Sequence, residues 1–441
     1  MRAEPVADAV VVAEGGGSAP RVRLPPLWLF GALAAIMLMM AAPKDIGDVF
    51  EYQCYALDFW QGAHVANTAL ATACSVKIPD LAATPFHELP REYGPLSLLV
   101  FSLPLLAPLG WYNTVFYVLM CGVILGVAWL LDRYGPRGAG HIWLLYTLLG
   151  VMLEAAGRFD ALPATAVLIA LLAAQRGRSL LGYGSLAVGA LLKFFPLALL
   201  PLLLIHSWRR RREEPFWRGP ALFAGLMLVG EGIAALISPT RALQPLGFMG
   251  ARCVEVEAFP ATLAYFWASL TGGSVKLEQV KQYSSVCQFA PGTDSAQTIA
   301  MLVAGVGLAA VYWLFWRGRL SLTHGFTFAT GLLIIGVKVF SVQYLLWLSP
   351  LIAYAYGTQA LALIGWGAVC LATSLYYPVA ITPWVVVNLG EWLADNTPLL
   401  VAVRNMLMMV VGGLALRGAL RQSRGAGGWV PPDAMEGERQ L

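Results

Sequence analysis

The sequence predicts an all-α polytopic membrane protein, and three observations predict it. Hydrophobic residues make up 58% of the 441 residues and charged residues only 12%, and the mean hydropathy is +0.67. Apolar runs recur along almost the whole chain, and many approach the roughly 20 residues that a helix needs to cross a hydrocarbon core of about 30 Å. These runs are continuous rather than alternating, which excludes a membrane β-barrel, so the spanning elements must be helices.

The two ends of the chain are predicted to be cytoplasmic tails. Residues 1–24 are polar and rich in glycine and alanine, which predicts disorder. The apolar run at residues 27–42 could be a cleavable signal peptide, with "MMAAP" as the cleavage site. The long tail before it contains acids as well as arginines, which favours a retained anchor. Residues 417–441 form the second tail, so the membrane domain is residues 25–416.

Basic residues set the predicted topology, because short cytoplasmic loops are enriched in lysine and arginine. One threading puts every basic cluster inside: Arg21 and Arg23, "DRYGPRG", "QRGRS", Arg209–Arg212, "WRGR", and Arg417, Arg421 and Arg424. It uses about twelve helices, near residues 25–42, 112–131, 141–156, 160–174, 180–193, 195–207, 217–237, 298–315, 321–340, 344–357, 360–378 and 398–416. The stretch Gly94–Gly110 is left over. Pro104 and Pro108 interrupt it, which favours a re-entrant or interfacial segment over a true span.

Two large loops then face the outer side, at residues 43–93 and 238–297. Nearly all the unusual charges of the chain lie in these loops or at the outer helix ends: Asp45, Asp48, Glu51, Asp58, His64, His87, Glu88, Arg91, Glu92, Glu154, Arg158, Asp160, Lys193, Glu231, Lys338, Arg241 and Arg252. Ionisable groups at such places are costly and usually face a cavity or one another. The sequence therefore predicts a functional site at the outer end of the bundle.

The first outer loop contains the strongest candidate for chemistry. Asp45 is suited to cap a helix that begins at Asp48. Helical spacing predicts an interfacial helix with Asp48, Glu51, Tyr52, Tyr55 and Asp58 on one face and Phe50, Cys54, Leu57 and Trp60 on another. Glu51 and Asp58 are interpreted as its solvated side. Asp48 lies just beyond the first span, where a carboxylate can reach the cavity and serve as a general base.

Five stretches of the sequence, in order, carry a resemblance to a known family. They are "GDVFEYQCYALDFWQG", "REYGPLSLL", "GRFDALPA" followed by "LLKFFPLALLPLLL", and "KVFSVQYLLWLSPLIA". They resemble integral-membrane glycosyltransferases of the GT-C fold, in particular glycosyltransferase family 87, the polyprenol-phosphate-mannose-dependent mannosyltransferases and relatives. The matching blocks span about Lys44 to Ala353, with Val342 where the family usually has proline. The resemblance implies a GT-C-type bundle, an outward-facing site, and an essential acid at Asp48 or, as second candidate, Asp45.

The resemblance also implies a reaction. A hexose, with mannose as the first expectation, would pass from a polyprenyl-phosphate-linked donor to a lipid or glycan acceptor with inversion. Transfer of a pentose or an aminosugar is the alternative within this class. A polytopic lipid or solute transporter and a non-catalytic glycan-binding or assembly protein on the same fold are the alternatives outside it. The chain has no D-x-D or nucleotide-binding motif, so no metal, no cofactor and no nucleic-acid partner is expected.

Cations are needed to neutralise the departing polyprenyl phosphate. The candidates for binding donor phosphate or sugar are Arg158, Asp160, Lys193, Lys338, Gln343, Tyr344, Arg252 and Arg241. Other interpretations stay open: the two lysines could snorkel to the interface, Arg158 could pair with Asp160, and Gln343 and Tyr344 could pack at a helix start. His64 and His87 could orient the acceptor or be merely solvated.

Four of the six cysteines lie in the outer loops. Disulfides persist outside the cytoplasm, so we expect Cys54 to pair with Cys74 and Cys253 with Cys287. Cys121 and Cys370 lie within helices and are interpreted as small core residues.

Overall fold

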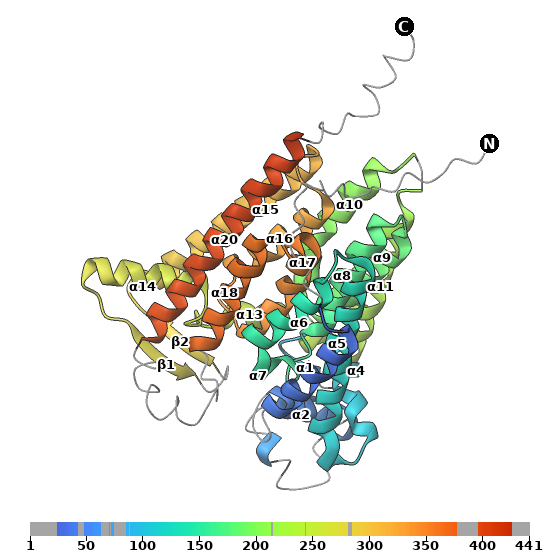
Figure 1. The fold of residues 1–441 in the computed structure, drawn as a ribbon. Coiled ribbons are helices and arrows are strands. Elements are labelled where there is room, and N and C mark those ends of the chain that lie inside the picture. Colours follow the sequence, from blue (N-terminus) through green and yellow to red (C-terminus); the bar gives the residue numbers. More distant parts are fainter. Residues whose placement is uncertain are drawn as a thin grey trace, which may run out of the picture.

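The computed structural model describes residues 24–42, 48–62, 70, 72–74, 85–87, 89–212, 215–242, 244–280, 285–376 and 396–425. Within these ranges the chain is mostly helical, and most of the helices gather into one elongated bundle (Figure 1). Asp45, His64 and the two predicted tails, apart from Leu24 and residues 417–425, lie outside the described residues.

Each of the twelve predicted ranges coincides with a helix. In order they are α1 (Leu27–Ala41), α5 (Tyr112–Tyr134), α6 (Ala139–Gly150) with the short α7 (Met152–Ala155), α8 (Ala161–Gln175), α9 (Ser179–Leu192), η4 (Phe195–Leu199) with α10 (Leu200–Arg209), α11 (Arg218–Ile237), α15 (Thr293–Trp316), α16 (Leu322–Gly336), η6 (Val342–Tyr344) with α17 (Leu345–Tyr356), α18 (Ala360–Tyr376) and α20 (Thr397–Gly425). The positions of the helices were therefore predictable.

Far fewer of these helices are long enough to cross a bilayer unaided. Among the described residues, four are sufficiently long and apolar: Leu109–Tyr134, Arg218–Ile237, Thr293–Trp316 and Thr397–Ser423. The others are shorter; the 12 residues of α6, for example, extend about 18 Å at 1.5 Å per residue. A short helix is tolerated at membrane depth where neighbouring helices cover its ends. The expected number of about twelve spans is thus not confirmed.

The leftover stretch Gly94–Gly110 forms a broken helix. It consists of α4 (Ser97–Ser102), η2 (Leu103–Leu106) and the start of η3 (Leu109–Trp111). The ten helical residues of α4 and η2 extend no more than about 20 Å, even at the 3₁₀ rise of 2.0 Å per residue. Such a short, interrupted element fits the predicted re-entrant or interfacial segment.

The second large loop contains a β-hairpin, so the all-α prediction is wrong there. Strands β1 (Lys276–Val280) and β2 (Ser285–Phe289) pair antiparallel, and Glu255 forms an isolated bridge with Cys287. Two strands of five residues give too little periodicity to separate them from loop. The rest of this loop forms α12 (Pro239–Ala242), α13 (Gln244–Ala251) and α14 (Phe259–Thr271).

Helix α2 (Asp48–Gln61) forms as predicted, but its faces differ from the prediction. Asp58 is fully buried, whereas Trp60 is 45% exposed and donates a hydrogen bond to Ser102. Tyr52 is also buried, and its ring stacks on Phe101 with centroids 4.2 Å apart. The solvated-face interpretation of Asp58 is therefore wrong, because α4 and α5 pack against α2 and nine of its 14 residues are buried.

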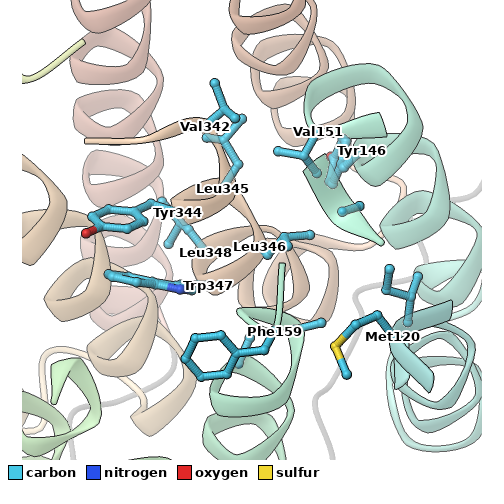
Figure 2. Close-up of a cluster of buried hydrophobic side chains, with 14 of the residues drawn as sticks. Met120, Tyr146, Val151, Phe159, Val342, Tyr344, Leu345, Leu346, Trp347 and Leu348 are labelled. Carbon is cyan, nitrogen blue, oxygen red and sulfur yellow. The ribbon is translucent and has the colours of Figure 1, made fainter. Parts of the chain in front are cut away.

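The main hydrophobic core fixes the start of α17 beside the turn between α7 and α8. Figure 2 shows Leu345, Leu346 and Leu348 packed with Val151 and Phe159, and all five side chains are buried. Burying side chains of this size favours folding by about 1.5–3 kcal/mol each. This packing holds the polar end of α17 in place.

The basic clusters of the described chain gather at one end of the bundle. The Arg176 guanidinium, at the end of α8, lies 4.4 Å from the Tyr134 ring at the end of α5. Arg209, at the end of α10, donates hydrogen bonds to the carbonyls of Phe315 and Trp316 at the end of α15. The threading that grouped these clusters is confirmed in this respect. We call this the basic end; α2 and the hairpin lie at the opposite end (Figure 1).

Candidate active site

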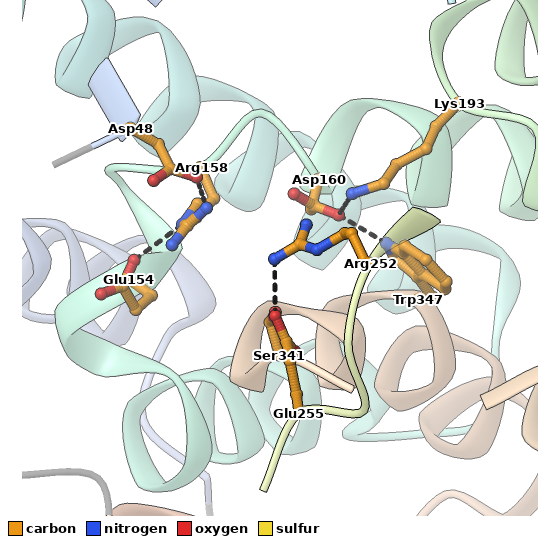
Figure 3. A network of polar contacts seen from close by, with 9 residues as sticks. All are labelled: Asp48, Glu154, Arg158, Asp160, Lys193, Arg252, Glu255, Ser341 and Trp347. Atoms are coloured by element: carbon orange, nitrogen blue, oxygen red, sulfur yellow. Dashed lines mark hydrogen bonds and ion pairs between the residues drawn. The ribbon is translucent and has the colours of Figure 1, made fainter. Parts of the chain in front are cut away.

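The end opposite the basic end holds a network of charged side chains from four separate segments (Figure 3). Asp48 begins α2, and the α7–α8 region supplies Glu154, Arg158 and Asp160. Lys193 follows α9, and the loop between α13 and α14 supplies Arg252 and Glu255. Ser341 and Trp347, on either side of η6, complete the network.

Arg158 joins two carboxylates. Its Nε donates to Glu154 Oε2 at 2.8 Å, and its Nη1 forms an ion pair with Asp48. The side chains of Arg158 and Asp48 are only 17% and 18% exposed. A guanidinium has several donors in a rigid plane, so it can fix the Asp48 carboxylate in one orientation. The alternative that Arg158 pairs with Asp160 is wrong.

Asp160 pairs with Lys193 instead. Its Oδ1 accepts hydrogen bonds from Lys193 Nζ at 2.7 Å and from Trp347 Nε1 at 2.8 Å, and Asp160 is 1% exposed. Four aromatic rings surround the ammonium, with centroids 5.0–5.7 Å from Nζ: Tyr93, Phe159, Tyr344 and Trp347. Cation–π contacts of this kind stabilise a desolvated ammonium. Lys193 therefore does not snorkel to the interface.

Arg252 and Glu255 form the third ion pair. Arg252 Nη2 lies 2.6 Å from Glu255 Oε1, and Ser341 Oγ donates to Glu255 Oε2 at 3.2 Å. Burial raises the pKa of Glu255, while Arg252 acts to lower it. Burial also raises the pKa of Glu92, against the charges of Arg252 and Lys193. Glu92 thus belongs to the same electrostatic environment.

A buried clamp from α20 holds the segment that follows Glu255. Arg404 is fully buried, donates to the Glu257 carbonyl at 2.8 Å and lies 4.0 Å from the Phe340 ring. Asn405 donates to Thr262 Oγ1 at 2.7 Å. Burial raises the pKa of the Glu257 carboxyl to about 8. The clamp holds the Glu257 backbone and the first turn of α14 in place.

Sequence reasoning assigned no role to Trp347, Glu255 or Arg404. The signal for Arg404 was present, because an arginine followed by asparagine interrupts the apolar run of α20, and ionisable groups in such runs are usually functional or paired. Nothing local distinguishes Trp347 from the other tryptophans. Glu255 gains its importance only when its loop meets Ser341.

The remaining predicted site residues lie elsewhere or are packed. Tyr344 and Gln343 are buried at the start of α17, and the Tyr344 ring stacks on Trp347 at 3.8 Å. Lys338 donates to the Gly250 carbonyl at 2.5 Å rather than to an acid of the network. His87 is exposed, with Nδ1 2.7 Å from the Pro85 carbonyl. The Arg241 side chain lies outside what the structure describes.

Both predicted disulfides are confirmed. Cys54 is bonded to Cys74 and Cys253 to Cys287, with Cα–Cα distances of 5.4 and 5.9 Å. Cys121 and Cys370 are free and buried. Within the described ranges, no group of three or more metal-ligating side chains is placed to hold a metal ion.

This arrangement suits a ligand that combines negative charge with hydroxyl groups. Three cations, Arg158, Lys193 and Arg252, lie at the same end as the Asp48 carboxylate. Cations in a partly water-excluded site stabilise anionic oxygens strongly. A carboxylate within reach of a hydroxyl group can accept its proton.

The chain matches the model of a known protein family. The model of glycosyltransferase family 87 matches residues 92–341, which is more than half of the chain. The matched range includes Arg158, Lys193 and Arg252, whereas Asp48 precedes it and Trp347 follows it. A search of curated proteins finds no match.

Proposed function

Because the chain belongs to glycosyltransferase family 87, we propose that it transfers a hexose, mannose in the first instance, from a polyprenyl-phosphate-linked donor to a lipid or glycan acceptor. Glycosyltransferase activity follows from the family. The donor, the sugar and the residue roles are the proposal. The reaction would take place on the extracytoplasmic side of the cell membrane, with the basic end and both termini in the cytoplasm.

The observation that carries the proposal is the network at one end of the bundle. It combines a carboxylate held by a guanidinium, Asp48 with Arg158, and two further cations, Lys193 and Arg252. A lipid phosphate at a membrane surface needs such cations, and a sugar acceptor needs such a base. Pairing with carboxylates keeps the cations in place before substrate arrives.

The proposed step is a single displacement. Asp48 accepts the proton of the acceptor hydroxyl while the hydroxyl oxygen attacks the anomeric carbon. The bond from that carbon to the phosphate oxygen breaks, and the electron pair leaves with the polyprenyl phosphate. Attack from the face opposite the leaving group inverts the anomeric configuration. Arg252 and Lys193 stabilise the charge that develops on the phosphate.

The test compares substitutions of acidic residues, each of which removes one carboxylate, at positions with different proposed roles. Asp48→Asn keeps the shape but cannot accept a proton, so turnover should fall by at least ~10²–10⁴-fold. Binding of the lipid donor should change much less, because cations hold the phosphate. The assay measures sugar transfer from a panel of polyprenyl-phosphate donors carrying a hexose, a pentose or an aminosugar, and it identifies the donor sugar at the same time.

Two variants serve as controls for Asp48→Asn. Glu154→Gln removes the other carboxylate on Arg158 and should lower turnover only modestly, through looser positioning of Asp48. Glu278→Gln removes an exposed acid of the hairpin and should leave turnover unchanged. Near-normal turnover of Asp48→Asn together with an inactive Asp45→Asn would move the base to Asp45. Full activity of both would remove the base from this stretch.

A further inference from the structure

An apolar groove lies away from the candidate active site, among helices α15, α16, α17, α18 and α20. Its volume is about 370 Å³, within the range of roughly 300–1,000 Å³ typical of ligand sites. Its lining is almost entirely apolar and includes Leu332, Trp366 and Met408, with Gln359 and Gln422 at the basic end. Neither the charged network nor the proposed reaction uses this groove.

Glycines on α20 keep the groove open. Gly412, Gly413 and Gly418 all line it, and a Cβ atom at any of the three would meet no heavy atom within 4 Å. Helical spacing places Gly412 on the same face of α20 as the buried, groove-lining Met408 and Ala419, so a larger side chain at this position would project into the groove without a clash. A single substitution at Gly412 can therefore fill part of the groove.

The groove opens onto the lipid-facing surface. Met409 and Leu414 on α20 line it and are 43% and 45% exposed, and Leu361 on α18 is 43% exposed. Helix α20 is long and apolar enough to cross a bilayer, so these side chains meet acyl chains rather than water. Because an apolar space in contact with lipid gains from being filled, the occupant should be a hydrocarbon chain.

Two arginines lie beside the groove at the basic end. Arg417 and Arg421 line a neighbouring hollow that shares Gly413 and Leu416 with the groove. Both arginine side chains are exposed. Basic pockets beside membrane helices attract anionic head groups, and the planar guanidinium matches the geometry of a phosphate.

We propose that this groove binds one acyl chain of an anionic phospholipid whose phosphate is held by Arg417 and Arg421. The site is separate from the donor site. On α20, Arg404 lies near the charged network, and Arg421 lies 17 residues further along the helix, about 25 Å away at 1.5 Å per residue. One phosphate cannot contact both ends.

Photolabelling of the full-length protein tests the proposal. The protein is reconstituted in phosphatidylcholine vesicles that contain phosphatidylglycerol with a photoreactive acyl chain. Crosslinks should map to groove-lining residues of α16, α18 and α20. Gly412→Leu should reduce this labelling several-fold by filling the groove. Gly225→Leu, which also projects into open space but lies on α11, should leave it unchanged.

A second arm tests the head group. In Arg417→Gln/Arg421→Gln, the preference for labelled phosphatidylglycerol over labelled phosphatidylcholine should fall by about fivefold for each arginine, the factor that corresponds to about 1 kcal/mol near a membrane surface. Arg317→Gln/Arg319→Gln removes the same charge from the α15–α16 turn at the same end. This control should retain the preference.

Three results would overturn the proposal. Equal labelling of the wild-type groove by both lipids would exclude head-group recognition, and undiminished labelling of Gly412→Leu would place the lipid elsewhere. Competition by a polyprenyl phosphate but not by phosphatidylglycerol would assign the groove to the donor chain. Sugar-transfer turnover is measured in parallel, so a failure here is separate from a failure of the proposed reaction.

Discussion

Asp160 shows how a single residue organises the charged network. It is almost completely buried and accepts from both Lys193 and Trp347, so three segments meet at one carboxylate oxygen. A buried ion pair contributes little net stability compared with apolar packing, but loss of one partner leaves an uncompensated charge. The pair should therefore be sensitive to single substitutions and tolerant of a matched double substitution.

We expect Lys193→Met to lower the free energy of unfolding by about 3–5 kcal/mol, because Asp160 would stay buried without its cation. Asp160→Asn/Lys193→Met should cost less than the sum of the two single variants. Trp347→Phe keeps an aromatic ring next to Phe195 and Tyr344 but loses one hydrogen bond, at a cost of about 1–3 kcal/mol. Equilibrium unfolding in mixed detergent measures these three variants and the single variant Asp160→Asn. If the effects of Asp160→Asn and Lys193→Met were strictly additive in the double variant, Asp160 and Lys193 would act independently.

Glu257 should make stability depend on pH. Its pKa is raised from 4.5 to about 8: burial contributes most, Glu255 and Glu154 also raise the pKa, and Arg404 and Arg158 lower it. Between these two values the folded state keeps a proton that the unfolded state has lost, so stability falls as pH rises through this window. The stability that the raised pKa of Glu257 gives the folded state is complete below about pH 4.5 and is lost as pH rises through about 8.

The variant Glu257→Gln is neutral at every pH and should flatten this part of the stability profile. Above about pH 8 it should be more stable than the parent by at least about 1.4 kcal/mol, the equivalent of one pKa unit. Thermal unfolding across this pH range measures the difference. The stability of Glu278→Gln, whose side chain is 53% exposed, should change with pH as that of the parent does. If the stability of Glu257→Gln also fell with pH as the parent's does, the pH dependence would not come from Glu257.

At the scale of elements, the second large loop is held by three different attachments. The disulfide Cys253–Cys287 joins the end of α13 to β2, the Glu255 bridge pairs with the same cysteine, and Arg404 with Asn405 clamps the Glu257 carbonyl. These attachments place Arg252 and Glu255 at the network. The loop therefore behaves as part of the site rather than as a surface insertion.

Removal of this disulfide should affect both stability and activity. Cys253→Ala/Cys287→Ala should lower the free energy of unfolding by about 2–4 kcal/mol, and turnover should fall because Arg252 becomes less well positioned. Peptide mapping without reducing agent checks the bridge itself. Cys54→Ala/Cys74→Ala provides the matched comparison. The disulfide that it removes joins cysteines 20 residues apart in the sequence, whereas Cys253 and Cys287 are 34 residues apart. Activity that is unchanged after loss of Cys253–Cys287 would contradict the positioning role.

At the scale of the whole molecule, the bundle has two chemically different ends. Arginines from α5, α8, α10 and α15 meet at the basic end, while the paired acids and cations lie at the other. Positive residues are retained on the cytoplasmic side during insertion. The same charge separation that sets the orientation would leave the network exposed to lipid-linked substrates outside.

We expect a cysteine at Arg211 to be labelled only from the cytoplasmic side and a cysteine at Lys276 only from the outer side. Lys276 is 73% exposed on the hairpin, and Arg211 is exposed at the end of α10. The background should be low, because Cys121 and Cys370 are buried and Cys253 is bonded to Cys287. Labelling of both positions from one side would contradict the proposed orientation.

The sequence by itself determined the class of the protein and the positions of its helices. Continuous apolar runs leave helices as the remaining way to satisfy backbone hydrogen bonds in a membrane, and each predicted range coincides with a helix. The grouping of basic clusters and the two disulfides were also predictable, since charge and cysteine placement follow from topology. So was the end of the bundle at which Asp48, Arg158, Asp160, Lys193 and Arg252 gather.

Only the tertiary structure decided which of these charges pair. Arg158 binds Asp48 and Glu154 rather than Asp160, and Lys193 takes Asp160, because the α7–α8 turn points two neighbouring side chains in different directions. The burial of Asp58 and the hairpin likewise depend on contacts between distant segments. Sequence periodicity reports what one segment would do alone, whereas the partner of a charge and the covered face of a helix are set by what packs against them.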